Sequence, residues 1–141
     1  MKEVVILVGM PGAGKTHYCR TVLPDHVRIS QDEGPRHFKG VLGRYQRLLT
    51  EGVERIVIDR TNPMRSQRAH FTQLARLHGY RVRIVHLDVP RAVCEQRILG
   101  RKDHPTLDGR RMAEAVNRYQ SCLEAPVAEE CDELVVLGQV P

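Results

Sequence analysis

The sequence has no tryptophan, and two phenylalanines and four tyrosines bring its aromatic residues to only 4% of 141. Few rings are therefore available to stack on bases, which argues against a long single-strand binding surface. No apolar run approaches the length of a membrane span, and the run before Gly9 is too short for the core of a signal peptide. Lysine is also scarce, so arginine dominates a net charge of +5, and this charge predicts anionic partners.

The cysteines are few and lack a metal-binding pattern. The chain has four, with no C-x-x-C pair and no zinc-like spacing to its seven histidines. This usage indicates reduced thiols and a cytoplasmic protein. The length falls in the usual range for one domain, so we expect residues 1–141 to form a single domain.

Strand-like and helix-like segments alternate along the whole chain, without a repeat, linker or low-complexity tract. This alternation predicts an α/β fold, in which a parallel sheet carries helices on both faces. We predict strands at 3–8, 27–30, 55–59, 81–87 and 133–137. We predict helices at 15–22, 40–51, 63–78, 90–99 and 109–123. The third helix is expected to begin at Pro63, with Asn62 as its N-cap residue.

Gly9 to Thr16 reads Gly-Met-Pro-Gly-Ala-Gly-Lys-Thr, which is the phosphate-loop pattern G-x-x-x-x-G-K-[ST] between a predicted strand and a predicted helix. Its glycines let backbone N–H groups approach phosphate oxygens closely. Lys15 can add positive charge at the β- and γ-phosphates, and the Thr16 hydroxyl is placed to ligate Mg²⁺. We expect ATP or GTP with Mg²⁺, contacted by Gly9, Pro11, Gly12, Ala13, Gly14, Lys15, Thr16, His17, Arg97 and Arg101.

Residues that directly follow the strands are further candidates, because ligands of open parallel sheets bind outside the carboxyl ends of the strands. Asp32 follows the second predicted strand. Its carboxylate could accept a proton from an acceptor hydroxyl held in line with the γ-phosphate. A solvated acid or a helix cap is the alternative interpretation of Asp32. Asp59 and the Thr61-Asn62 pair follow the third strand.

A basic segment lies between the last two predicted helices. Arg97 and Arg101 stand four residues apart and share one face if the helix continues that far. We expect residues 97–108 to form a lid whose cations screen charge on the transferring group. A solvated basic helix end would have the same composition, because cations favour helix C-termini.

These motifs together resemble the 5′-hydroxyl polynucleotide kinases of the P-loop phosphotransferase group. The resemblance covers nearly the whole chain. The motifs, in that family's order and approximate spacing, are Gly9–Thr16, the Asp32 segment, Thr61-Asn62, Asp88-Val89-Pro90 and the Arg97/Arg101 pair. The resemblance implies a three-layer P-loop kinase fold with a five-stranded parallel sheet of order 2-3-1-4-5 and a lid.

The resemblance also implies catalytic roles for individual residues. Asp32 would match the family's general base. Lys15 would contact phosphate, Thr16 would contact the metal, and Arg101 would be the arginine of the lid. We therefore expect Asp32, Lys15 and Arg101 to be the catalytic residues.

The acceptor side is implied less completely. Thr61-Asn62 falls in the family's acceptor-side loop, and Asp59 would help to organise the metal through water. The bacteriophage member of this kinase family has an arginine three residues beyond its base, where this chain has Pro35, so Arg36 is the nearest candidate. We expect Arg36 to join Asp32, Thr61 and Asn62 as a substrate-binding residue.

The resulting expectation is an ATP-dependent, Mg²⁺-requiring kinase that acts on the 5′-hydroxyl of an RNA or DNA end. Ligase or phosphatase chemistry would then come from a separate chain. Two alternatives stay open. One is a small-molecule kinase with a nucleoside, sugar or antibiotic acceptor, and the other is a nucleotide-binding module without transfer activity. The few aromatic residues favour the small-molecule kinase, or a nucleic-acid contact limited to the terminal nucleotides.

Overall fold

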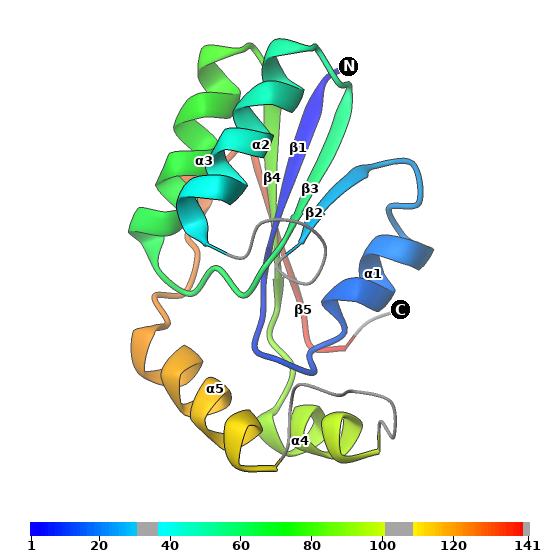
Figure 1. The fold of residues 1–141 in the computed structure, drawn as a ribbon, viewed down its shortest axis with the longest axis vertical. Coiled ribbons are helices and arrows are strands. Elements are labelled where there is room, and N and C mark those ends of the chain that lie inside the picture. The colour runs from blue at the N-terminus through cyan, green and yellow to red at the C-terminus, as the bar shows by residue number, and fades with distance from the viewer. Residues whose placement is uncertain (31–36, 101–108, 140–141) are drawn as a thin grey trace.

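The computed structural model describes residues 1–30, 37–100 and 109–139, and their arrangement is shown in Figure 1. One parallel sheet runs through the described residues in the order β2-β3-β1-β4-β5. Its strands are β1 (Glu3–Val8), β2 (Val27–Ser30), β3 (Arg55–Asp59), β4 (Arg81–Leu87) and β5 (Glu133–Leu137). The expected fold class and strand order are confirmed, and each strand has its predicted bounds.

Helices cover both faces of this sheet (Figure 1). They are α1 (Lys15–Thr21), α2 (Phe38–Thr50), α3 (Arg65–Leu77), α4 (Arg91–Leu99) and α5 (Gly109–Cys122), with a short 3-10 helix, η1 (Ala128–Glu130), before β5. The helices α2 and α3 pack on one face, whereas α1, α4 and α5 pack on the other. The three layers are therefore helix, sheet and helix.

The central strand β1 explains the two hydrophobic cores. Successive side chains of a strand point to opposite faces, and a strand covered on both faces is apolar at every position. Val4 and Ile6 accordingly pack with α2 and α3, while Val5 and Leu7 pack with α1, α4 and α5. All four side chains are fully buried, so β1 and the loop after it are held from both sides.

Two helix starts lie two residues from their predicted positions. The helix α2 begins two residues early, because the His37 side chain accepts a hydrogen bond from the Gly40 N–H at 2.8 Å and caps it. The predicted N-cap role of Asn62 is wrong, since α3 begins at Arg65. Asn62 instead has a left-handed φ of 46°, and its buried amide donates to the Leu7 carbonyl at 2.8 Å. Because the Asn62 side chain is bonded to the Leu7 carbonyl, it does not cap the helix.

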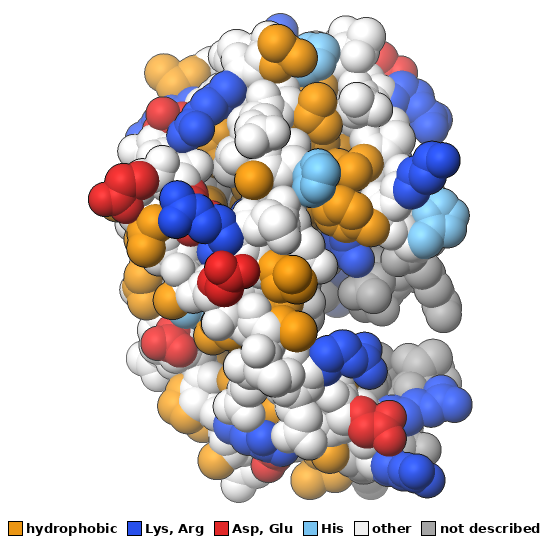
Figure 2. All heavy atoms as spheres, turned by 90° about the vertical axis from the view of Figure 1, so that its left-hand side faces the viewer, with side chains coloured by type: hydrophobic (Ala, Val, Ile, Leu, Met, Phe, Trp, Pro, Cys, Tyr) orange, Lys and Arg blue, Asp and Glu red, His pale blue; other side chains and the backbone are white. Residues whose placement is uncertain are grey.

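The outer face of α2 and α3 has a shallow hollow (Figure 2). The hollow is lined by Leu42, Gln46, His70, Gln73, Leu74 and Leu77. It lies within the helical layer and not at the strand ends. None of the described helices is both long and apolar enough to cross a lipid bilayer.

Candidate nucleotide-binding site

The phosphate loop lies at the carboxyl edge of the sheet, directly after the central strand β1. Because β3 and β4 flank β1, the segments that leave these strands are its neighbours. The Gly9 N–H donates to the Thr61 carbonyl at 3.1 Å, which joins the phosphate loop to the loop after β3. This is the switch point of the sheet, where ligands of such folds bind.

Two glycines give the phosphate loop its conformation. Gly12 and Gly14 have positive φ values of 84° and 99°, which other residues rarely adopt. A Cβ atom at Gly12 would lie 2.5 Å from the Cys94 carbonyl oxygen of α4. The loop and α4 are therefore in direct contact, and only glycine fits between them.

Lys15 and Thr16 follow the loop in the first turn of α1. The Lys15 ammonium donates to the carbonyls of Gly9 and Met10 at 3.0 and 2.9 Å, so it folds back over the loop. The Thr16 hydroxyl donates to Asp59 Oδ2 at 3.2 Å, and Asp59 is 6% exposed at the end of β3. The two residues predicted to organise a metal are thus brought together from distant parts of the sequence.

Arg28 of β2 contacts the same two side chains and is not among the residues predicted from the sequence. Its Nε donates to Asp59 Oδ2 at 2.6 Å, and its Nη2 donates to the Thr16 hydroxyl oxygen at 3.2 Å. Arg28 is paired with Val57 across the sheet and therefore faces the α1 side. A charged residue on the buried face of a strand is the signal that would have indicated a partner here.

Arg97 lies against the phosphate loop, as its place in the predicted site requires. Its Nη1 donates to the carbonyls of Gly12 and Ala13 at 3.4 and 3.2 Å. The described part of helix α4 ends at Leu99, so the face that Arg97 and Arg101 are expected to share stays a prediction. Arg101 lies outside the described residues, and so do Asp32 and Arg36.

The remaining predicted contacts differ in exposure. Pro11 is half-buried in the loop, and His17 is exposed on the first turn of α1. Thr61 is half-buried, whereas Asn62 is 3% exposed and its amide is bonded to the backbone. The side chain of Asn62 therefore supports the loop after β3, and Thr61 is the more accessible of the pair.

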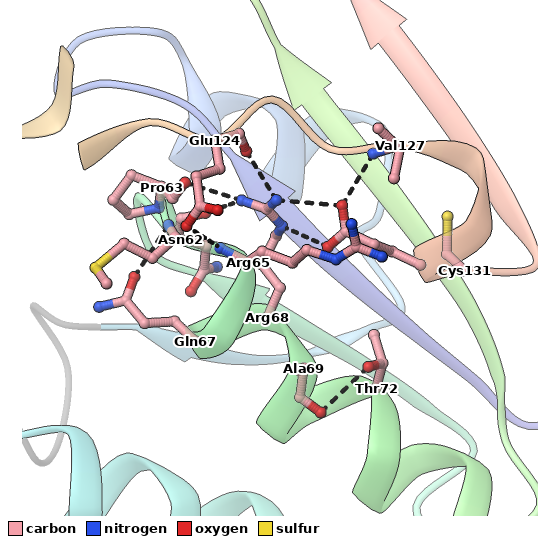
Figure 3. A network of polar contacts seen from close by, with 12 residues as sticks. Asn62, Pro63, Arg65, Gln67, Arg68, Ala69, Thr72, Glu124, Val127 and Cys131 are labelled. Atoms are coloured by element: carbon pink, nitrogen blue, oxygen red, sulfur yellow. Dashed lines mark hydrogen bonds and ion pairs between the residues drawn. The ribbon is translucent and has the colours of Figure 1, made fainter. Parts of the chain in front are cut away.

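A fully buried arginine fixes the loop after β3 (Figure 3). Arg68 of α3 bonds Glu130 at 3.0 and 3.2 Å through Nε and Nη2. Its remaining bonds go to the carbonyls of Asn62 and Pro63, both at 3.0 Å, and of Glu124, at 2.8 Å. Burial raises the pKa of Glu130, but the hydrogen bonds and charge of Arg68 outweigh it, so the pKa is lowered overall. One guanidinium thus connects the loop after β3 to η1 and to the segment after α5.

The buried cysteines Cys19 and Cys94 are not reactive thiols. Burial raises the pKa of the Cys19 thiol to about 12 and also raises that of Cys94, so both thiols stay protonated at neutral pH. Among the described residues, no three His, Cys, Asp or Glu side chains gather into a metal-binding group. The polar groups of this edge are those of a phosphate site.

A family model described as an AAA domain matches residues 4–126, which is most of the chain. The chain belongs to this AAA domain family. The AAA-domain chain is 32% identical over 135 residues to transcription factor bHLH140 of Arabidopsis thaliana, covering 90% of this chain and 15% of that protein. It is 26% identical over 132 residues to a bifunctional polynucleotide phosphatase/kinase of Schizosaccharomyces pombe, covering 92% and 31% respectively. The chain therefore spans less than a third of the length of either relative.

Solved structures show the same fold. A sugar kinase from Janibacter sp. HTCC2649 matches with a TM-score of 0.68 at 19% identity, covering 98% of this chain and 85% of that one. A fungal RNA kinase matches with a TM-score of 0.62 at 14% identity, covering 96% and 74%. The AAA-domain chain thus has the P-loop kinase fold.

Proposed function

We propose that this AAA-domain chain transfers the γ-phosphoryl group of ATP to the 5′-hydroxyl of an RNA or DNA end. The observation that carries the proposal is the meeting of the phosphate loop with the loop after β3, through Gly9–Thr61 and Thr16–Asp59 hydrogen bonds. The Schizosaccharomyces pombe relative is named for a polynucleotide kinase, and a structural neighbour is named as an RNA kinase. These names support the choice of acceptor.

The donor triphosphate would lie in the phosphate loop. Backbone N–H groups of the loop would bind its oxygens, and the Lys15 ammonium would exchange the Gly9 and Met10 carbonyls for β- and γ-phosphate oxygens. Arg97 already lies beside the loop, within reach of the same charge. These groups would stabilise the negative charge that spreads over the transferring phosphoryl group.

The side chains near the loop fit a magnesium ion. Mg²⁺ prefers hard oxygen ligands and is commonly bound through one or two protein side chains, substrate phosphate and water. The hydroxyl of Thr16 and the carboxylate of Asp59 are oxygen ligands of this kind, and their oxygens are 3.2 Å apart. Bound there, Mg²⁺ would neutralise charge on the phosphate oxygens. Arg28 contacts both side chains and would compete with the ion for them.

In the transfer step, the acceptor oxygen attacks the γ-phosphorus, and the bond from that phosphorus to the bridging oxygen of ADP breaks. The proton of the hydroxyl passes to a carboxylate, a role that the sequence assigns to Asp32. In-line positioning of the two substrates supplies much of the rate enhancement in reactions of this class.

The test is transfer of label from γ-labelled ATP to 5′-hydroxyl oligonucleotides in the presence of Mg²⁺. We expect Asp32→Asn to lower the transfer rate by about 10²- to 10⁴-fold, as the loss of a general base does. Asp25→Asn is the matched control, because Asp25 is an acid whose side chain is 78% exposed on the loop before β2. Lys15→Met should abolish transfer.

Two results would contradict the proposal. If Asp32→Asn and Asp25→Asn label the oligonucleotide equally, Asp32 is not the base. If the wild-type protein labels a nucleoside or a sugar but no oligonucleotide, the acceptor is a small molecule. Added salt separates these acceptors further, because binding through backbone phosphates weakens steeply with salt and binding of an uncharged metabolite does not.

A further inference from the structure

Arg60, the residue directly after β3, is a half-buried cation whose buried Nε donates no hydrogen bond in the described part of the chain. Its guanidinium lies over the ring of Phe38, 5.3 Å from the ring centre. Burial also lowers the pKa of the guanidinium. A cation taken out of water in this way costs free energy unless an anion compensates for it.

Three other arginines with little exposure are compensated by carboxylates. Arg28 pairs with Asp59 at 2.6 Å, Arg68 pairs with Glu130 at 3.0 Å, and Arg83 pairs with Glu3 at 3.3 Å. For Arg60, the described residues provide the Phe38 ring but no carboxylate. The ring orients the guanidinium and leaves its charge available to an anion.

The strand places Arg60 on the side away from the donor phosphates. Along β3, Ile58 packs with α2 and α3, and Asp59 turns to the α1 side, where it meets Thr16. Arg60 follows in the alternation and lies against Phe38 at the start of α2. Its carbonyl also accepts from the Asn62 amide at 3.3 Å, which fixes the turn. Arg60 therefore lies at the carboxyl end of β3 on the α2 side of the sheet, opposite the pair formed by Thr16 and Asp59. In the proposed reaction, this side would hold the acceptor.

We infer that Arg60 binds a phosphate ester of the acceptor, namely the phosphodiester that follows the terminal nucleoside of an RNA or DNA end. The inference rests on the proposed function and specifies its substrate class. A guanidinium presents paired N–H donors that match two phosphate oxygens. One such contact beside the reacting hydroxyl suits a chain with few aromatic residues for stacking on longer strands.

The experiment measures calorimetric binding of three acceptors that differ in phosphate. They are adenosine, with none; the 5′-hydroxyl dinucleotide ApA, with one phosphodiester; and adenosine 3′-monophosphate, with one monoester. We expect the wild-type protein to bind ApA more tightly than adenosine. Arg60→Gln should weaken ApA binding by about tenfold to a hundredfold, the usual loss for a hydrogen bond to a charged group, and should leave adenosine binding unchanged.

Two further variants separate phosphate binding from general effects. Arg55→Gln removes the same charge from the opposite end of β3, where the side chain is 52% exposed and 3.7 Å from Asp25, and it should change ApA binding little. Arg60→Lys should recover part of the ApA affinity. In a salt titration with a longer 5′-hydroxyl oligonucleotide, Arg60→Gln should reduce the slope of log K against log salt by about 0.7.

The outcomes are distinct. Equal wild-type affinities for adenosine and ApA, or equal losses for both in Arg60→Gln, would overturn the inference. A loss confined to adenosine 3′-monophosphate would assign Arg60 to a phosphorylated small molecule and overturn the nucleic-acid assignment. If ApA binding depends on Arg60 but no acceptor is ever labelled, the kinase proposal fails and the Arg60 inference stands.

Discussion

Replacing Arg68 by methionine should destabilise the fold more than any surface change in the chain. The guanidinium is fully buried, and Glu130, its partner, is 6% exposed at the side chain. Removing one member of a buried pair leaves the other charge without compensation and costs about 3–5 kcal/mol. The carbonyls of Asn62, Pro63 and Glu124 would also lose their donors. We expect a loss of about 4 kcal/mol, a large part of the stability of a typical domain.

Urea unfolding at pH 7 would measure this loss. With a typical dependence of about 2 kcal/mol per molar urea, the midpoint should fall by about 2 M. Arg81→Met is the matched control, because Arg81 also pairs with a glutamate at 3.0 Å, but both side chains are 42% exposed. Pairs of that kind contribute about 0–1 kcal/mol. A loss in Arg68→Met no larger than in Arg81→Met would refute the reasoning.

The pH dependence gives the prediction a second test. In the wild type the pKa of Glu130 is lowered, so its contribution to stability is present above its unfolded value near 4.5 and is lost as pH falls through the folded pKa. Without Arg68, burial raises the pKa of Glu130, and the penalty is largest at neutral pH. The difference between Arg68→Met and the wild type should therefore shrink as the pH falls from 7 towards 4.5. The double variant Arg68→Met, Glu130→Met should be more stable than Arg68→Met at pH 7, because it leaves no unpaired charge.

Two predictions concern the nucleotide site. Gly12→Ala should destabilise the fold by more than 1 kcal/mol and weaken nucleotide binding, because its Cβ would lie 2.5 Å from the Cys94 carbonyl oxygen at a φ of 84°. Thermal unfolding and fluorescent-nucleotide titration would check this against Gly43→Ala, where no atom lies within 4 Å, and equal effects would contradict it. Arg28→Met should raise the Mn²⁺ affinity of the nucleotide-free protein several-fold, because it removes a positive charge that contacts the oxygen ligands of Thr16 and Asp59. Electron paramagnetic resonance would measure this affinity. Weaker Mn²⁺ binding would mean that Arg28 holds those ligands in place.

Local patterns were sufficient to predict the strands and the phosphate loop. Apolar runs such as Val4–Val8 are strands because both faces of a parallel sheet are covered, and their bounds were confirmed. Lys15 and Thr16 begin α1 directly after the loop, as the motif specifies, whereas their contacts with phosphate and metal stay predictions. The strand order came from the family resemblance and is confirmed by the topology.

Long-range pairing was beyond local patterns. Arg68 looks in the sequence like Arg65 and Arg76, which share its helix, yet of the three only Arg68 is fully buried and pairs with the carboxylate of Glu130, 62 residues further along the chain. Asn62 was mistaken for a helix cap for the same reason, because the carbonyl that binds its amide belongs to Leu7 of β1. In both cases the partner comes from an element that only the folded sheet brings near.

The arginines of the chain show why a net charge of +5 is an incomplete guide to its partners. Arg28 and Arg68 are neutralised by carboxylates within the fold, so their charges add little attraction for an external anion. Arg97 is bonded to carbonyls of the phosphate loop and adds positive charge where a triphosphate would lie. Arg60 meets an aromatic ring and no carboxylate among the described residues. Attraction for a second anion at this edge should therefore depend on Arg60 far more than on total charge, which is why Arg60→Gln and Arg55→Gln, equal in net charge, are expected to differ.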